Sequence, residues 1–186
     1  MSAPPTASQT AGPYFHIGLS WLGAEALAPP GATGERVTIS GRVLDGDGKP
    51  VDDAVLEVWR ADAEGRYPHP DDPRGGGGPG LQGFGRVPTG KDGAFRFTTI
   101  VPGRVPGPGG RLQAPHLAVS VFMRGLLRHL VTRVYFPGEA CATDPVLELV
   151  EPARRCTLIA RPGAGPAALE WSVVLQGESE TVFFDC

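Results

Sequence analysis

The side chains that could do chemistry in this chain are few, and they are mainly phenols and imidazoles. Tyr67 and His69 lie close together in a loop without periodicity, and His116 opens a run of alternating apolar residues. Such groups, when they converge in a pocket, can bind a ligand or a metal ion. The histidines form neither an HxH nor an HExxH pair, however. Residue types alone therefore leave two interpretations open, a binding site or hydrogen-bonded structural residues.

A second unusual stretch is SQTAGPYF, residues 8–15. The first residues of a domain usually form a frayed polar tail. This segment instead combines a Gly-Pro turn with two aromatic residues, Tyr14 and Phe15, and Ile17, Leu19 and Trp21 follow. Either the aromatic side chains cover the edge of the chain's own domain, or they meet a partner.

The composition limits the class of protein. With 186 residues, of which 41% are hydrophobic and 20% charged, the chain can form one globular domain with a real core. A net charge of −3 argues against nucleic acid as a partner. The start MSAPPTASQT has no signal-peptide pattern, and no apolar run is long enough to span a membrane. Three cysteines without a CxxC pair favour a reducing, cytoplasmic setting.

The elements that must position these residues are short strands. The chain has 27 glycines and 20 prolines, and many of them separate runs of alternating apolar and polar residues. This pattern predicts an antiparallel two-sheet β-sandwich with long Gly/Pro-rich loops and little helix. The first two strands, joined by DGDGKP, are expected to form a hairpin-like pair. Strands are expected at residues 36–44, 54–60, 85–88, 94–100, 116–123, 129–136, 157–161, 170–175 and 181–184.

Several motifs resemble those of the intradiol ring-cleaving dioxygenases. They are TAGPY, LEVWRADAEGRYPHP, GFGR, APHLAVSVFMRG and QGESETVFFD, and the similarity runs over nearly the whole chain. The resemblance implies a β-sandwich enzyme that uses O2 and non-haem Fe(III) to open a catechol ring between its two hydroxyl-bearing carbons. In the catalytic chains of this family, two tyrosines and two histidines hold the iron.

The resemblance also implies that this chain lacks a full set of iron ligands. Tyr67 matches the first tyrosine and His116 the first histidine, but Val105 and Ala118 stand in the other two positions. Gln113 replaces an arginine that the family pattern places three residues before the first histidine. Valine and alanine donate nothing to a hard cation. We therefore expect a vestigial site, with no metal and no complete catalytic set on this chain, in which Tyr67 and His116 serve packing and hydrogen bonding.

A partner is implied as well. In enzymes of this kind, two diverged copies of one sandwich pair, and the pairs assemble into a larger oligomer; the partner chain would hold the Fe(III). The resemblance places five residues of this chain in the partner's substrate pocket, where the arginine would face a carboxylate-bearing catechol. They are Thr10, Gly12, Pro13, Tyr14 and Arg133.

The expected organisation is an N-terminal arm, residues 1–35, that reaches the partner, and a single sandwich domain, residues 36–186. Two other interpretations compete with this one. A stand-alone intradiol enzyme is disfavoured because ligands are missing. A non-catalytic, transthyretin-like β-sandwich binding module remains the alternative.

Overall fold

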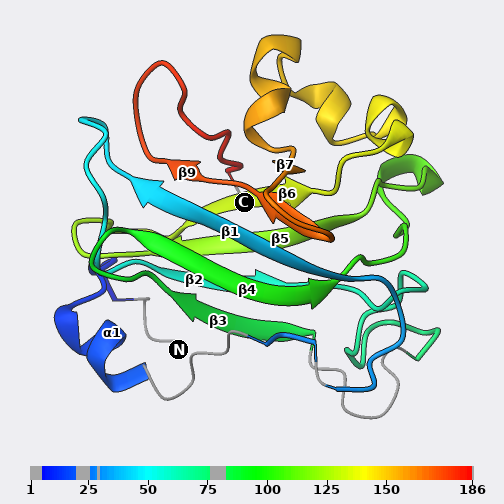
Figure 1. Ribbon diagram of the computed structural model, residues 1–186, viewed down its shortest axis with the longest axis horizontal. Helices are drawn as coiled ribbons and strands as arrows, with labels where there is room; N and C mark the ends of the chain where they lie inside the picture. Colours follow the sequence, from blue (N-terminus) through cyan, green and yellow to red (C-terminus); the bar gives the residue numbers. More distant parts are fainter. Residues whose placement is uncertain (1–5, 20–25, 29, 76–82, 186) are drawn as a thin grey trace, which may run out of the picture.

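Two β-sheets pack face to face in the computed structural model, which describes residues 6–19, 26–28, 30–75 and 83–185 (Figure 1). One sheet has the order β4-β1-β8-β7, with β9 also paired to β1, and is called the β1 sheet; the other, the β5 sheet, has the order β3-β2-β5-β6. The strands are β1 Arg36–Leu44, β2 Val55–Trp59, β3 Phe84–Pro88, β4 Ala94–Ile100, β5 His116–Phe122, β6 Leu130–Tyr135, β7 Arg161–Pro162, β8 Ala168–Glu170 and β9 Val173–Val174. The helical elements are α1 Pro13–Leu19 and the 3-10 helices η2 Pro108–Gly110, η3 Glu139–Thr143, η4 Leu147–Leu149 and η5 Pro152–Thr157.

The core lies between the two sheets. Alternate residues of each strand point inward, and Ile39, Phe97, Val58, Leu117 and Val134 are at most 1% exposed. Burying an aliphatic or aromatic side chain of this size contributes about 1.5–3 kcal/mol relative to exposure. The expected sandwich with little helix is confirmed, and the alternation that predicted most of its strands comes from this burial.

The predicted hairpin between the first two strands is wrong. β1 pairs with β4 over its length, whereas β2 pairs with β3 and β5, so β1 and β2 lie in different sheets. The DGDGKP turn does form, because the Asp45 carboxylate accepts hydrogen bonds from the backbone N–H groups of Asp47 and Lys49 at 2.9 and 2.8 Å. After this turn the chain passes from the β1 sheet to the β5 sheet.

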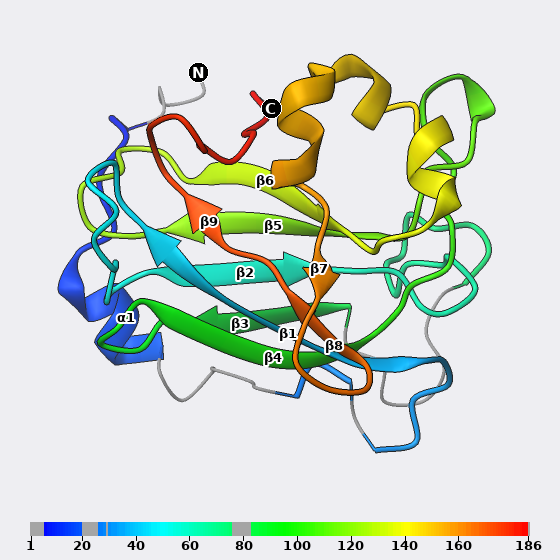
Figure 2. The same ribbon diagram turned by 45° about the horizontal axis from the view of Figure 1, so that its top comes forward.

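The C-terminal strands also differ from the prediction. Of the strand expected at 157–161, Thr157 ends η5, Ile159 makes only an isolated bridge to Tyr135, and Arg161 begins β7. The 181–184 segment makes only an isolated bridge between Val131 and Phe184. In place of the strand expected at 170–175 are β8, which ends at Glu170, and β9; both run parallel to β1, so this sheet is mixed rather than wholly antiparallel. The 3-10 helices between β6 and β7 lie together beyond the β6 edge of the sandwich (Figure 2).

The division between β8 and β9 has a local cause. The Trp171 backbone N–H donates to the Ser40 carbonyl at 2.9 Å, and the indole packs edge-on against Phe95 in the core. The Trp171 carbonyl comes so close to Gly41 that a methyl group there would collide with it. Gly41 therefore permits the close approach that a larger residue in the middle of β1 would prevent.

The N-terminal segment contains a short helix that the sequence did not predict. α1 begins at Pro13, whose fixed φ suits the first turn of a helix. The Phe15 ring packs on Phe122 of β5 with centroids 5.3 Å apart, while Tyr14 and Ile17 are 84% and 63% exposed. Trp21 lies outside the described residues. The Phe15 ring therefore covers the edge of the chain's own domain, whereas the Tyr14 ring remains exposed. No helix in the described ranges has the length and apolar character needed to cross a membrane.

Candidate functional site

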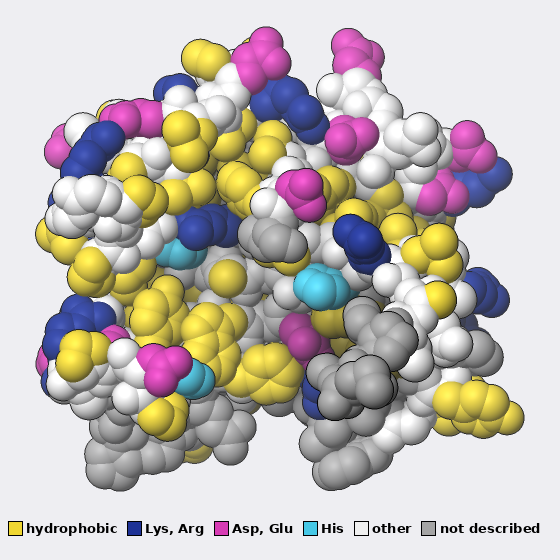
Figure 3. Space-filling view, turned by 180° about the vertical axis from the view of Figure 1, so that it is seen from behind, with side chains coloured by type: hydrophobic (Ala, Val, Ile, Leu, Met, Phe, Trp, Pro, Cys, Tyr) yellow, Lys and Arg dark blue, Asp and Glu magenta, His cyan; other side chains and the backbone are white. Residues whose placement is uncertain are grey.

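The candidate site is built on the outer face of the β5 sheet. The strand register places Trp59 opposite Ala118 and Ala118 opposite Arg133. Residues directly opposite one another on neighbouring strands point to the same face. Their chain neighbours Val58 and Leu117 fill the core, so this row points outward. Figure 3 shows the corresponding side of the molecule, where hydrophobic side chains surround a hollow in which a basic side chain and a histidine lie side by side.

The loop after β2 covers one end of this row. The Tyr67 ring stacks on the Trp59 indole with centroids 6.1 Å apart, and His69 meets the same indole edge-on. The loop is fixed by Asp72, which accepts a hydrogen bond from the Tyr67 backbone N–H at 2.9 Å and binds the Arg74 guanidinium at 2.7 Å. A cavity of about 670 Å³ opens beside these side chains. This end of the site is therefore an aromatic-walled hollow.

His116 is buried and neutral. Its pKa falls to about 4, because burial disfavours the imidazolium and the positive charge of Arg133 opposes it further. Nδ1 lies 2.8 Å from the Ala114 carbonyl, so the neutral ring donates its proton there. The ring packs against Tyr135, with centroids 5.2 Å apart. His116 thus packs and hydrogen-bonds within this chain.

Arg133 is anchored within the chain. Its Nη1 donates to the Gln113 side-chain oxygen at 2.6 Å and to the Tyr135 hydroxyl at 3.2 Å, and the guanidinium lies over the Phe184 ring. Gln113 is itself held by a 2.9 Å hydrogen bond to the Pro106 carbonyl. Nε and Nη2 of Arg133 make no hydrogen bond to any residue that the structure describes. Nη1 is therefore held by hydrogen bonds within the chain, and the Nε–Nη2 edge of the guanidinium can make other contacts.

Asp144 was missed by the sequence analysis, and so was the bond that links it to this site. The carboxylate is fully buried and accepts from the Tyr135 hydroxyl at 3.2 Å and from the Ala114 N–H at 2.7 Å. It also accepts from the N–H groups of Val146 and Leu147, which start η4. Burial raises the pKa of Tyr135, so its hydroxyl stays protonated. An aspartate just before a proline and a short apolar run is a helix-start signal, and only this local role was readable from the sequence.

The four positions that the resemblance matches to iron ligands lie on or beside this face. Val105 is buried, and its carbonyl accepts the Gln113 N–H at 2.8 Å. Ala118 lies in the outward row, two residues from His116 on β5 and opposite Trp59, on which Tyr67 stacks. Burial raises the pKa of the Tyr67 phenol, and the charge of Arg133 opposes this rise. One phenol and one imidazole, with Val105 and Ala118 in the other two places, leave a ferric ion two ligands short.

The predicted arm residues lie at the other end of the same face. The Thr10 hydroxyl accepts the Gly125 N–H at 2.8 Å, which ties the arm to the turn between β5 and β6. The Gly12 carbonyl accepts the Phe15 N–H at 2.9 Å, and Pro13 is the first residue of α1. The arm and the turn border a groove of about 540 Å³.

This groove leads toward Arg133. It extends to Val131 and Phe184. Val131 and Arg133 are two residues apart on β6 and so share its outer face, and the Arg133 guanidinium covers the Phe184 ring. The structure therefore brings Thr10 and Arg133 to one face, on either side of Phe184.

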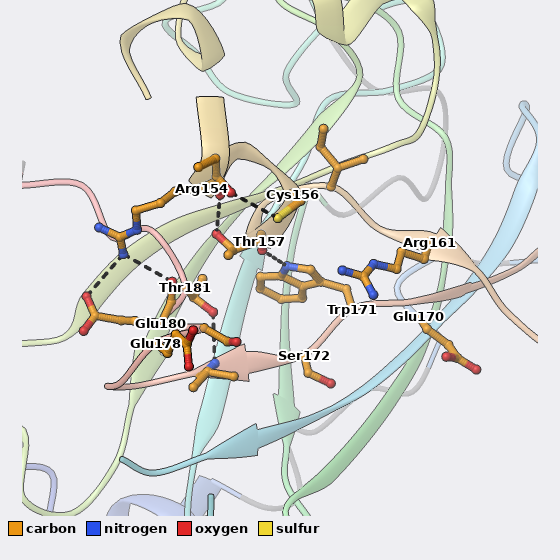
Figure 4. A pocket seen from close by; sticks show the side chains of 14 residues that line it. Arg154, Cys156, Thr157, Arg161, Glu170, Trp171, Ser172, Glu178, Glu180 and Thr181 are labelled. Carbon is orange, nitrogen blue, oxygen red and sulfur yellow. Dashed lines mark hydrogen bonds and ion pairs between the residues drawn. The ribbon is translucent and has the colours of Figure 1, made fainter. Parts of the chain in front are cut away.

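A separate hollow of about 570 Å³ lies between η5 and the β8–β9 segment (Figure 4). There the Trp171 indole N–H donates to the Thr157 carbonyl at 3.0 Å, and Arg154 pairs with Glu180 at 3.4 Å. None of the site residues expected from the sequence lines it. Its polar side chains contact one another, which gives no reason to assign it to the chemistry of the β5 sheet.

Comparison with known proteins assigns the family. The sequence profile described as dioxygenase matches residues 11–177. The chain is 44% identical to the protocatechuate 3,4-dioxygenase alpha chain of Burkholderia cepacia, over 97% of this chain and 96% of that one. It is 36% identical to the beta chain from the same organism, over 96% and 79% of the two chains. Among solved structures, the dioxygenase domain from Streptomyces sp. SirexAA-E is 30% identical with a TM-score of 0.62, over 86% and 89% of the two chains. The chain is thus a member of the intradiol dioxygenase family.

Proposed function

We propose that this chain is the alpha subunit of a protocatechuate 3,4-dioxygenase, in which a beta chain holds the Fe(III). The assembled enzyme would cleave protocatechuate with O2 to 3-carboxy-cis,cis-muconate. One observation carries the proposal: a chain that matches both subunits over most of its length has Val105 and Ala118 at two ligand positions. Family membership does not favour the alternative, a non-catalytic transthyretin-like binding module.

We further propose that the arm, residues 1–35, reaches the beta chain's pocket from the sandwich domain of residues 36–186. Gly12 allows the backbone to approach a ligand closely, and Pro13 stiffens the turn. The free Nε–Nη2 edge of Arg133 has the fork geometry that binds a carboxylate through two parallel hydrogen bonds. The exposed Tyr14 ring is available to the same partner. Free thiols at Cys141 and Cys156 agree with a cytoplasmic location.

Producing this chain with and without its beta chain tests the function. Turnover should require both chains, since iron comes from one and part of the pocket from the other. Oxygen uptake with protocatechuate should be absent for this chain alone and maximal for the purified complex. This chain should also give a higher soluble yield when it is produced with the beta chain than alone, because Tyr14 and Ile17 expose apolar surface that a partner would cover. Turnover by this chain alone, or a complex no more active than the beta chain, would contradict the proposal.

A further inference from the structure

The guanidinium of Arg133 lies among the positions that have lost their ligands. Its strand position is directly opposite Ala118. Its Nη1 is bound to the side chain of Gln113, whose backbone N–H is bound to the Val105 carbonyl. Arg133 is thus connected to both positions where a metal-binding side chain is missing: to Ala118 by strand pairing and to Val105 through Gln113.

The two ligand positions that remain are close to the same charge. His116 lies two residues from Ala118 on β5, and its ring packs against Tyr135, whose hydroxyl accepts from Arg133. Tyr67 stacks on Trp59, which lies opposite Ala118 on the neighbouring strand. Both surviving residues are therefore placed around Ala118, the position opposite Arg133. Among the residues that the structure describes, no carboxylate contacts the guanidinium directly: its acceptors, the Gln113 side chain and the Tyr135 hydroxyl, are neutral.

The carboxylate of Asp144 provides a counter-charge that reaches Arg133 through one intervening side chain, Tyr135. The Tyr135 hydroxyl accepts from Arg133 and donates to the buried carboxylate of Asp144. A buried charge is stable only when it is paired and hydrogen-bonded. The series of hydrogen bonds from Arg133 through Tyr135 to Asp144 satisfies this requirement without a metal ion.

We propose that the Arg133 guanidinium has taken the place of the metal in this chain's own pocket, balanced through Tyr135 by Asp144. The pocket would then reject a ferric ion even if both missing ligands were restored. Gln113 is consistent with this replacement. The family pattern has an arginine at that position, whereas in this chain the guanidinium belongs to Arg133 of β6 and donates a hydrogen bond to the neutral Gln113 amide. The proposal concerns this chain by itself and does not depend on turnover by the assembled enzyme.

Rebuilding the metal site tests the proposal. The first variant, Val105→Tyr with Ala118→His, restores the ligands and keeps Arg133. The second adds Arg133→Gln, and the third instead adds Arg133→Lys as a charge-matched control. After refolding with Fe(III), the variant without the positive charge should retain at least about tenfold more iron than the other two, because like charges in a half-buried site repel strongly. It alone should show a visible tyrosinate-to-Fe(III) band.

Thermal unfolding of all three variants establishes that each is folded before its iron is measured. Equal iron in the first and second variants would show that Arg133 does not exclude the metal. A folded second variant that stays empty would also overturn the proposal, since removing the charge would then have restored nothing. Iron binding by the Arg133→Lys variant would show that charge is not the reason.

Discussion

Replacing Arg133 by alanine in the assembled enzyme should lower kcat/KM for protocatechuate roughly 10- to 100-fold, since a charge-assisted hydrogen bond contributes about 1.5–3 kcal/mol. The guanidinium is oriented by Gln113 and Tyr135, and its outer edge is free for a carboxylate. The loss should be smaller for catechol, which has no carboxylate. Steady-state oxygen uptake with both substrates measures the difference.

Two control variants separate this role from a structural one. Arg133→Lys keeps the charge without the fork and should recover part of the efficiency. Arg96→Ala removes an exposed arginine from β4, on the opposite sheet, and should change nothing. Iron content and assembly should be the same in all complexes. Full efficiency of Arg133→Ala with protocatechuate would reduce this chain to a scaffold, and failure to assemble would make Arg133 an interface residue.

Replacing Asp144 by alanine should destabilise the fold by about 3 kcal/mol or more, because it leaves several buried donors without an acceptor. The carboxylate accepts the N–H groups of Ala114, Val146 and Leu147 as well as the Tyr135 hydroxyl. For a chain of this size the loss corresponds to a fall in Tm of about 6–12 °C. Thermal unfolding of the assembled complex, followed by circular dichroism, measures it.

Asp71 offers a matched control. Its side chain is 91% exposed, and Asp71→Ala should shift the free energy of unfolding by no more than about 0.5 kcal/mol. If the complexes carrying Asp144→Ala and Asp71→Ala unfold at the same temperature, the buried carboxylate does not hold β6 and η4 together.

The sequence predicted the features that depend on local alternation. The bounds of β1 and β4 match the expected residues 36–44 and 94–100, because a period of two within one strand requires only that one face be buried. The pairing of β1 was not readable in the same way. It follows from packing across the core, so the adjacent β2 went to the other sheet despite a strong turn signal between them.

Part of the candidate site was also predictable from the sequence, and part was not. Tyr67, His116 and Arg133 were found through motifs that carry their own context in the sequence. The connection of Arg133 to Asp144 was not, because it passes through Tyr135 and joins residues whose contact depends on how η3 and η4 pack beyond β6. The break at Trp171 was hidden for a similar reason: it requires Gly41 on a strand far away in the chain.

The central claim is that this chain carries no iron of its own and works on a partner's iron. Iron analysis and visible spectroscopy of this chain, purified alone after exposure to Fe(III), test it most directly. The account predicts a colourless chain without stoichiometric iron, and a coloured complex with one iron per pair once the beta chain is added. One iron bound per chain, with a visible tyrosinate-to-Fe(III) band in the absence of the beta chain, would contradict it.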